Sequence, residues 1–398
     1  MNILEGQAAN DASLPDVGHR YSLAQVSAIM AVGVLAMVVA GIQPVVLGAL
    51  QSAGRMSLSQ MGVAATVELL ALGLMSALAE VIFSVRYLRI IGIATGVALI
   101  ALNLLSTVVS TWGLITVRAM AGVAGGILVW ITAGLITRSK APERFSAVFL
   151  TTQTLAQLGV ATLLPLIGLE NNADLGLWFL AAIAALATFF SLLIPRAYVP
   201  LAKAAGMGKT RSINVATFVN LLLVVAQLAF AVGIWIYMEP LTQRSGLSRH
   251  FTSVAIAVGL GAQIVGGITV MIVPKRFTPA GVFMVSGVVN MLALVVFAGH
   301  PSAPIFLLSV FVFGFLLLFV MPFQTLAVLR ADPSRRAAML VPFAQLLGAS
   351  LGPFAASMVV SETDISGVLV LGAGWIALWF AALLWLYLNQ SRKELAGA

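Results

Sequence analysis

Residues 112–147 read WGLITVRAMAGVAGGILVWITAGLITRSKAPERFSA, and this stretch decides the fold of the chain. Up to Thr137 the stretch is apolar apart from Arg118. This apolar part is longer than a helix needs to cross a bilayer core, which is about 20 residues. Gly122 and Gly126 lie four residues apart, a spacing that predicts close packing against a neighbouring helix. The stretch therefore predicts a membrane-spanning helix that carries one buried charge and ends at the basic loop 138–144.

The composition places the whole chain in a membrane. The 398 residues are 61% hydrophobic and 9% charged, with a mean hydropathy of +1.08. A soluble domain carries about a quarter charged residues, so we expect an all-α, multi-pass membrane protein. The net charge of +8 would suggest a nucleic-acid partner in a soluble protein. Here basic loops facing the cytoplasm explain it, and no nucleic-acid partner is predicted. The absence of cysteine excludes disulfide and thiol chemistry.

Apolar segments and their connections predict 12 transmembrane helices in two pseudo-symmetric six-helix bundles. The segments are roughly 23–51, 57–83, 88–110, 112–137, 146–168, 175–194, 213–240, 251–273, 279–299, 303–329, 337–360 and 365–389. The predicted organisation is a cytoplasmic tail (1–20), a first bundle (21–194), a cytoplasmic central loop (195–212), a second bundle (213–390) and a cytoplasmic tail (391–398).

The distribution of basic residues predicts the orientation of the chain. With both termini in the cytoplasm, most of the 21 basic residues fall on the cytoplasmic side. The outer side then holds Arg55, Arg244 and Arg249, and Arg118 lies within a span. Both termini are therefore expected in the cytoplasm, and the protein is expected in an inner or plasma membrane.

Short repeats support a division into two related halves. Residues 141–144 (APER) follow the fourth segment and 332–335 (DPSR) follow the tenth. Residues 156–159 (AQLG) in the fifth segment are echoed by 344–348 (AQLLG) in the eleventh. Two six-helix halves related by duplication are typical of transporters that bind their substrate between the halves.

With these features the chain resembles the major facilitator superfamily over about residues 21–390. Arg118-x-x-x-Gly122 resembles the fourth-helix arginine motif of proton-coupled members, with Ala121 in place of the usual glutamine. Residues 76–86 correspond to the conserved loop between spans two and three, where Glu80 stands for the usual aspartate. Gly348-x-x-x-Gly352-Pro353 lies in the eleventh segment. The resemblance implies the superfamily fold, with spans 1, 4, 7 and 10 lining the transport path.

Two charges lie deep within predicted spans, where each costs several kcal/mol. Glu68 is near the middle of the second span and Arg118 lies within the fourth. Burial disfavours a charged carboxylate and a neighbouring cation favours it, so we interpret the two residues as a proton-coupling pair. The alternatives are a static ion pair, or an arginine that reaches the outer interface. The resemblance also suggests a gate formed by Glu80 with Arg86 or Arg89, although these could be ordinary interfacial charges.

Polar and aromatic residues in the spans are candidates for substrate binding. The set is Gln43, Arg118, Trp130, Gln153, Gln157, Asn220, Gln227 and Trp235. Asn220 and Gln227 lie seven residues apart and therefore share a helix face. For each residue alone, interhelical hydrogen bonding or packing is an equally good explanation. Glu239, just before Pro240, is expected at the membrane interface.

We therefore predict a secondary active transporter for a small organic solute that is amphiphilic or aromatic. The buried arginine is a reason to include anions among the candidate solutes. Proton-coupled efflux is the favoured mode, and the alternative is a proton-coupled uptake symporter for an organic acid. An intramembrane enzyme or a receptor is a third class, for which the spans show no catalytic dyad. The protein is expected to be no enzyme and to act as a monomer. No cofactor or metal site is predicted, since the histidines lie in loops or near the ends of the chain.

Overall fold

The computed structural model describes residues 21–139, 142–168, 172–198, 214–272, 277–332, 340–361 and 364–396. Within these ranges the chain is all-α, with thirteen helices and no strand. The first six helices are α3 (Leu23–Ser52), α4 (Leu58–Ile82), α5 (Leu88–Val108), α6 (Thr111–Thr137), α7 (Pro142–Leu166) and α8 (Asp174–Ser191). The remaining helices are α9 (Val215–Ile236), α10 (Met238–Arg244), α11 (Arg249–Ile272), α12 (Pro279–Ala298), α13 (Ala303–Ala331), α14 (Val341–Val359) and α15 (Ser366–Ala396).

The starts of α3 and α4 are set by the same local signal. Ser22 accepts a hydrogen bond from the backbone N–H of Gln25, and the Gln25 side chain accepts one from Ser22. Ser57 and Gln60 repeat this reciprocal pair at the start of α4. Such capping boxes satisfy backbone donors that the first helical turn leaves without partners, which fixes where each helix begins.

The predicted spans correspond to α3–α9 and α11–α15. Eleven helices in the described part of the chain are long and apolar enough to cross a membrane. The other is α14, whose 19 residues include Pro342, Gln345 and Pro353. It packs against α4 and α9, in the place expected for the eleventh span.

Three predicted boundaries differ in the structure. The segment predicted as continuous over 213–240 breaks at Tyr237, because the ring of Pro240 would clash with the carbonyl group four residues earlier. The loop predicted over 138–144 is shorter, since α7 begins at Pro142, a residue suited to a first helical turn. The predicted C-terminal tail from 391 continues α15 as far as Ala396. The tail 1–20 and most of the central loop lie outside the described residues.

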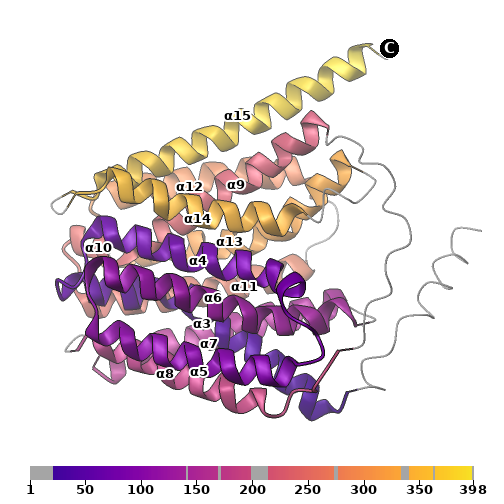
Figure 1. Cartoon of the computed structure of the whole chain (residues 1–398). Helices are drawn as coiled ribbons and strands as arrows, with labels where there is room; N and C mark the ends of the chain where they lie inside the picture. The colour runs from indigo at the N-terminus through magenta and orange to yellow at the C-terminus, as the bar shows by residue number, and fades with distance from the viewer. Residues whose placement is uncertain are drawn as a thin grey trace, which may run out of the picture.

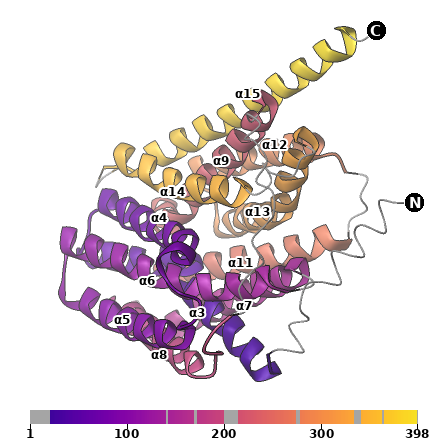
Figure 2. The ribbon, with the colours of Figure 1, turned by 45° about the vertical axis from the view of Figure 1, so that its right-hand side comes forward.

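Two groups of six long helices pack with the same pattern of neighbours. In the first half α4 packs against α6 and α5 against α8, and in the second half α11 packs against α13 and α12 against α15. The contacts between the halves follow the same symmetry, with α4 against α14 and α7 against α11. Figures 1 and 2 show the second half above the first, with α4 beside α14 in both views. The fold is therefore the predicted pair of pseudo-symmetric bundles.

The apolar core divides along the helix axes. We call the side where α3 begins and α15 ends the termini side, which lies to the right in Figure 2. On the opposite side, one core joins both halves, with Leu47 and Met61 packed in one cluster with Phe230 and Phe306. On the termini side, the first half has its own core around Leu128, and the second half has separate clusters, the largest around Trp379. The halves are therefore sealed together on the opposite side.

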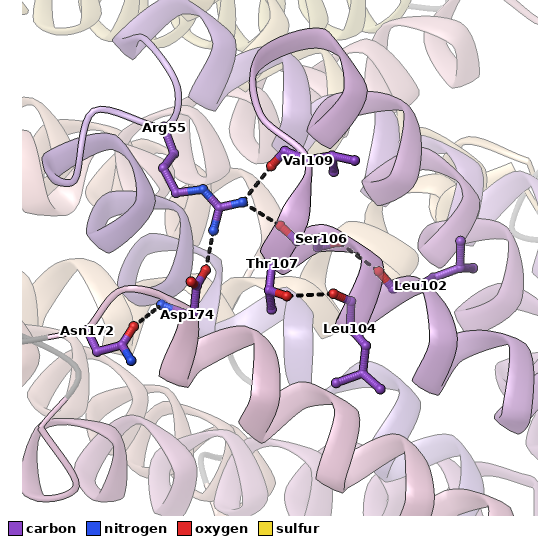
Figure 3. A network of polar contacts seen from close by, with 8 residues as sticks. All are labelled: Arg55, Leu102, Leu104, Ser106, Thr107, Val109, Asn172 and Asp174. Atoms are coloured by element: carbon purple, nitrogen blue, oxygen red, sulfur yellow. Dashed lines mark hydrogen bonds and ion pairs between the residues drawn. The ribbon is translucent and has the colours of Figure 1, made fainter.

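Arg55 ties together three connections of the first half on the opposite side (Figure 3). Its guanidinium forms an ion pair with Asp174, at the start of α8. The same group donates to the backbone carbonyl oxygens of Ser106, at 2.7 Å, and Val109. Asn172 in turn accepts from the backbone N–H of Asp174 at 3.0 Å. One side chain between α3 and α4 thus holds the end of α5 and the start of α8.

We expect Arg55→Ala to lower the free energy of unfolding by about 1–3 kcal/mol, because carbonyl groups and a carboxylate lose a charged donor together. Thermal unfolding of the purified protein in detergent measures the effect. Arg55→Lys should recover only part of the loss, since lysine lacks the planar fork. The exposed Arg86→Ala serves as the control, and equal stability of the Arg55 and Arg86 variants would contradict the assignment.

Candidate functional site

Glu68 and Arg118 form an ion pair inside the first half. Glu68 is 1% exposed and Arg118 is 2% exposed. Arg118 Nη2 binds Glu68 Oε1, and Arg118 Nε donates to Glu68 Oε2 at 3.2 Å. One edge of the guanidinium thus holds both carboxylate oxygens, a bidentate geometry that arginine provides and lysine does not. The two residues selected for their depth in the membrane therefore contact each other.

Two amide side chains complete a polar cluster around the ion pair. Arg118 Nη1 donates to Asn103 Oδ1 at 2.7 Å, and Gln43 Nε2 donates to Glu68 Oε2 at 3.2 Å. Both amides are buried. Helices α3, α4, α5 and α6 each contribute one residue, so the cluster belongs entirely to the first half. Asn103 was not predicted, although a single amide in the otherwise apolar α5 is a signal for such a role.

Close helix packing brings this cluster together. A Cβ atom added to Gly122 would lie 2.3 Å from the carbonyl oxygen of Glu68, and one added to Gly126 would lie 2.3 Å from that of Leu72. Only glycine allows α6 to approach α4 this closely. Gly348 and Gly352 do the same on α14, where added Cβ atoms would lie 2.5 and 2.1 Å from backbone oxygens of α9. The interpretation of both glycine pairs as packing residues is confirmed.

A cavity of about 20 Å³ lies beside the ion pair. Glu68, Asn103 and Arg118 form its polar wall, and apolar residues of α3, α4, α5, α6 and α8 form the rest. Since a water molecule needs roughly 10–15 Å³ measured in this way, the cavity has room for one water and not for an organic solute. The pair carries no net charge, so Arg118 is not an uncompensated cation for an anionic substrate in this conformation.

Three glutamines form a hydrogen-bonded chain in the second half. Gln345 Nε2 donates to Gln324 Oε1, and Gln324 Nε2 donates to Gln227 Oε1, both at 2.7 Å. The residues come from α14, α13 and α9, and the central Gln324 is fully buried. Gln227 was predicted as a site residue, and its two partners were not. Their absence from the prediction reflects the sequence, in which the three positions are far apart.

Two other predicted site residues bind carbonyl oxygens of α3. Trp235 Nε1 donates across the halves to the carbonyl oxygen of Gly41 at 3.2 Å. Its ring stacks on Phe313, with centroids 6.5 Å apart. Gln157 Nε2 donates to the carbonyl oxygen of Met37 at 2.9 Å within the first half. Both carbonyl groups lie in the part of α3 that precedes Pro44, a residue that cannot donate a backbone hydrogen bond.

The remaining predicted residues lie elsewhere. Trp130 is buried near the termini side, and Asn220 donates to the carbonyl oxygen of Ala216 on its own helix at 2.8 Å. Gln153 lies one turn before Gln157, and its Oε1 is buried without a hydrogen-bond partner among the described residues. The structure thus brings Gln43 and Arg118 together and distributes the other six candidates over both halves.

Glu80 binds residues of its own half. Its carboxylate accepts from Trp130 Nε1 at 2.7 Å and from Arg138 Nη2 at 3.2 Å. Arg89 Nε donates to the carbonyl oxygen of Ile194 at 2.9 Å, and Arg86 is exposed. The partner of Glu80 is therefore Arg138, directly after the end of α6, and neither of the arginines with which it was grouped. A gate between the halves remains a proposal for a conformation that closes the termini side.

Six hydrogen bonds join side chains of one half to the other half in the described part of the chain, and all lie away from the termini side. The donor–acceptor pairs are Trp235 with Gly41, Tyr237 with Leu58, Ser52 with Glu239, Gln243 with Ser52, Ser59 with Ser357, and Thr66 with Ser350. We call this set the seam. The expectation that Glu239 is an interfacial residue is wrong, since it is 5% exposed and its Oε1 accepts from Ser52 at 3.0 Å. The break at Tyr237 turns α10 towards α3 and buries the carboxylate.

Gly62 allows the two halves to approach closely within the seam. A Cβ atom there would lie 2.3 Å from Tyr237 Oη and 2.6 Å from the carbonyl oxygen of Pro353, both in the second half. We expect Gly62→Ala to open the seam, because the backbone of α14 cannot yield locally. A single cysteine at Ser350, in this cysteine-free chain, should react faster with a maleimide in the variant.

Gly126→Ala is the matched control, because its added Cβ meets Leu72 of the same half. It should lower stability without raising the labelling rate at position 350. Equal labelling rates in the Gly62→Ala and unmodified backgrounds would show that the seam closes around the extra methyl group.

Comparison with solved structures identifies the fold. A mutant form of the nucleoside transporter NupG matches with a TM-score of 0.74 at 15% identity, covering 91% of this chain and 100% of that chain. The xylose transporter XylE from E. coli, in a partially occluded inward-open conformation, matches with a TM-score of 0.63 at 12% identity, covering 91% and 97%. The human organic anion transporter MFSD10 matches with a TM-score of 0.59 at 15% identity, covering 91% and 99%.

These structures share the fold of this chain along nearly their whole lengths. No family model matches the sequence, and no curated protein matches it significantly. The class is therefore defined by structure: the chain is a multi-pass helical membrane protein with two related bundles. More specifically, it has the fold of major facilitator superfamily transporters.

Proposed function

We propose that this protein is a secondary active transporter that moves a small organic solute between its two halves by alternating access. The observation that carries the proposal is the unequal packing of the halves, which share one core and the seam on the opposite side and have separate cores on the termini side. Rocking the halves about this arrangement would open the seam and close the termini side. The similarity in fold to transporters of nucleosides, xylose and organic anions supports the same class.

Proton coupling is part of the proposal and rests on Glu68. A buried carboxylate is costly unless a cation compensates it, and Arg118 does so here. A proton arriving at Glu68 would leave Arg118 as the charged member, which changes what the cluster can bind. With both termini in the cytoplasm, as proposed, the termini side would face the cytoplasm and the seam would lie on the outer side. Efflux is the proposed direction, with the solute and the proton moving in opposite directions.

The substrate is proposed to be amphiphilic or aromatic. The substrate need not carry a negative charge, because Glu68 already binds Arg118 and the polar cluster around them has no net charge. Anions remain in the test because MFSD10 transports them and because protonation of Glu68 would free the guanidinium. An uptake symporter for an organic acid is the second form of the same proposal.

Purified protein in liposomes loaded with a pH-sensitive dye tests the proposal. The probes are panels of nucleosides, pentoses and aromatic or aliphatic organic anions, each offered with an imposed pH gradient. Efflux requires solute movement against the direction of proton flow, and uptake by symport requires movement with it. Solute movement that does not depend on the pH gradient would indicate a uniporter. If no solute of the panel moves, the proposal that the protein is a transporter is contradicted.

A further inference from the structure

The cavity beside Arg118 is lined by the first half alone. Its lining residues all belong to the first half, including Leu35 of α3, Leu99 of α5 and Ala184 of α8. Helix α8 packs against α3 and α5. The proposed solute path, by contrast, runs between α3–α8 and α9–α15. The polar wall of the cavity therefore faces the interior of one bundle.

We propose that this cavity holds the water that exchanges the proton of Glu68, and that Asn103 positions Arg118 for this exchange. The proton then reaches Glu68 through the first half, separately from the solute. This inference rests on the proton coupling proposed above. The cavity is large enough for one water, and its wall offers a carboxylate, a guanidinium and an amide, which are the two to four polar partners that a buried water needs.

The proton step is balanced within this cluster. A hydronium ion reaching the cavity transfers a proton to a Glu68 carboxylate oxygen. Its O–H bond breaks with the electron pair left on water, and a new O–H bond forms on Glu68. Arg118 remains a cation throughout. In the opposite conformation of the transport cycle, Glu68 returns the proton to a water molecule. The ion pair between Glu68 and Arg118 then forms again.

Asn103 matters because it is an acceptor that does not titrate. Arg118 Nη1 donates to Asn103 Oδ1 at 2.7 Å, on the part of the guanidinium that Glu68 does not bind. When Glu68 is neutral, this bond keeps the guanidinium in place, so the ion pair can form again. Asn103 is therefore a positioning residue, and it acts through Arg118.

The electrostatic surroundings of Glu68 are simple. Helix α4 packs against α3, α6, α9 and α14. Helices α3, α9 and α14 contain no charged residue, and they offer Glu68 only the amide of Gln43. On α6, the charged residue that faces Glu68 is Arg118. The pH response of the cluster is therefore set by Arg118 and by its second acceptor, Asn103.

Infrared spectroscopy of the whole protein in lipid tests the inference without a known substrate. The probe is the carbonyl stretch of a protonated carboxyl group that disappears in Glu68→Gln, followed during exchange from H₂O into D₂O. Filling the cavity with Ala184→Val should slow the deuterium shift of this band by roughly tenfold or more, as expected when a positioned proton donor is removed. Ala181→Val is the matched control, since Ala181 is buried on the same helix and does not line the cavity.

Asn103→Asp supplies the second readout. An added carboxylate competes for Arg118, so the pH profile of proton-driven transport should move towards alkaline pH, and Asn103→Gln should restore part of the original profile. A merely structural role for Asn103 would lower the rate at all pH values without moving the profile. Unchanged exchange in Ala184→Val and an unmoved profile in Asn103→Asp would overturn this inference, even if Glu68→Gln still abolishes coupling. If Glu68→Gln leaves coupling intact, the proposed role of Glu68 in proton coupling fails instead.

Discussion

Arg118→Ala is expected to abolish solute transport and to lower the free energy of unfolding by about 3–5 kcal/mol. The reason is that the substitution removes three hydrogen bonds and leaves Glu68, which is 1% exposed, without its cation. The loss is limited if Glu68 takes up a proton, so the protein should still insert and fold at acidic pH. Thermal unfolding at two pH values and liposome transport measure the two effects.

Two further variants separate the charge of Arg118 from its shape. Arg118→Lys keeps the charge and should recover little transport, because one ammonium group cannot hold both Glu68 oxygens and Asn103. Combining Arg118→Ala with Glu68→Gln removes the orphaned carboxylate, so it should regain stability without regaining transport. Full transport by Arg118→Ala would reduce the residue to a packing role.

The sequence predicted the helices of this fold well because a membrane reduces the problem to hydropathy and length. Each apolar run must be a helix, since the hydrocarbon core satisfies no backbone hydrogen bonds. Departures arise where local chemistry intervenes, as at Pro240, which breaks the seventh span after an apolar run that hydropathy alone joins together. The segment predicted over 337–360 corresponds to α14, although this helix contains Pro342, Gln345 and Pro353.

The candidate site was predicted in part, because a deep charge is visible in a sequence and its partner is not. Glu68 and Arg118 stood out by cost alone, although 50 residues separate them. Asn103 and Gln324 did not, since a single amide in a span is ambiguous until its neighbours are known. Glu239 was misplaced because its position near the end of a span indicated the interface, whereas the turn at Tyr237 buries it between the halves.

Glu68→Gln is expected to uncouple transport from the proton gradient. Glutamine keeps the shape of the side chain and removes its ionisation, so solute binding and exchange between two equal pools should persist. Accumulation or expulsion against a gradient should fail, and the pH dependence of binding should be lost. The liposome assay with a pH-sensitive dye measures exchange and gradient-driven transport on the same preparation.

The structure indicates that Glu68→Gln also lowers the stability of the protein. Glutamine at position 68 leaves Arg118 as a buried cation with Asn103 Oδ1 and one amide oxygen as acceptors, so stability should fall, by up to about 3–5 kcal/mol. Exchange must therefore be measured on folded protein, with Glu80→Gln as a comparison, because the buried Arg138 that it leaves still donates to the carbonyl oxygen of Gly134. Gradient-driven transport with unchanged pH dependence in Glu68→Gln would place the proton elsewhere, with Glu80 the next candidate, or make the protein a uniporter. Loss of exchange as well would indicate that the ion pair holds the first half in shape, and that its role in coupling is secondary.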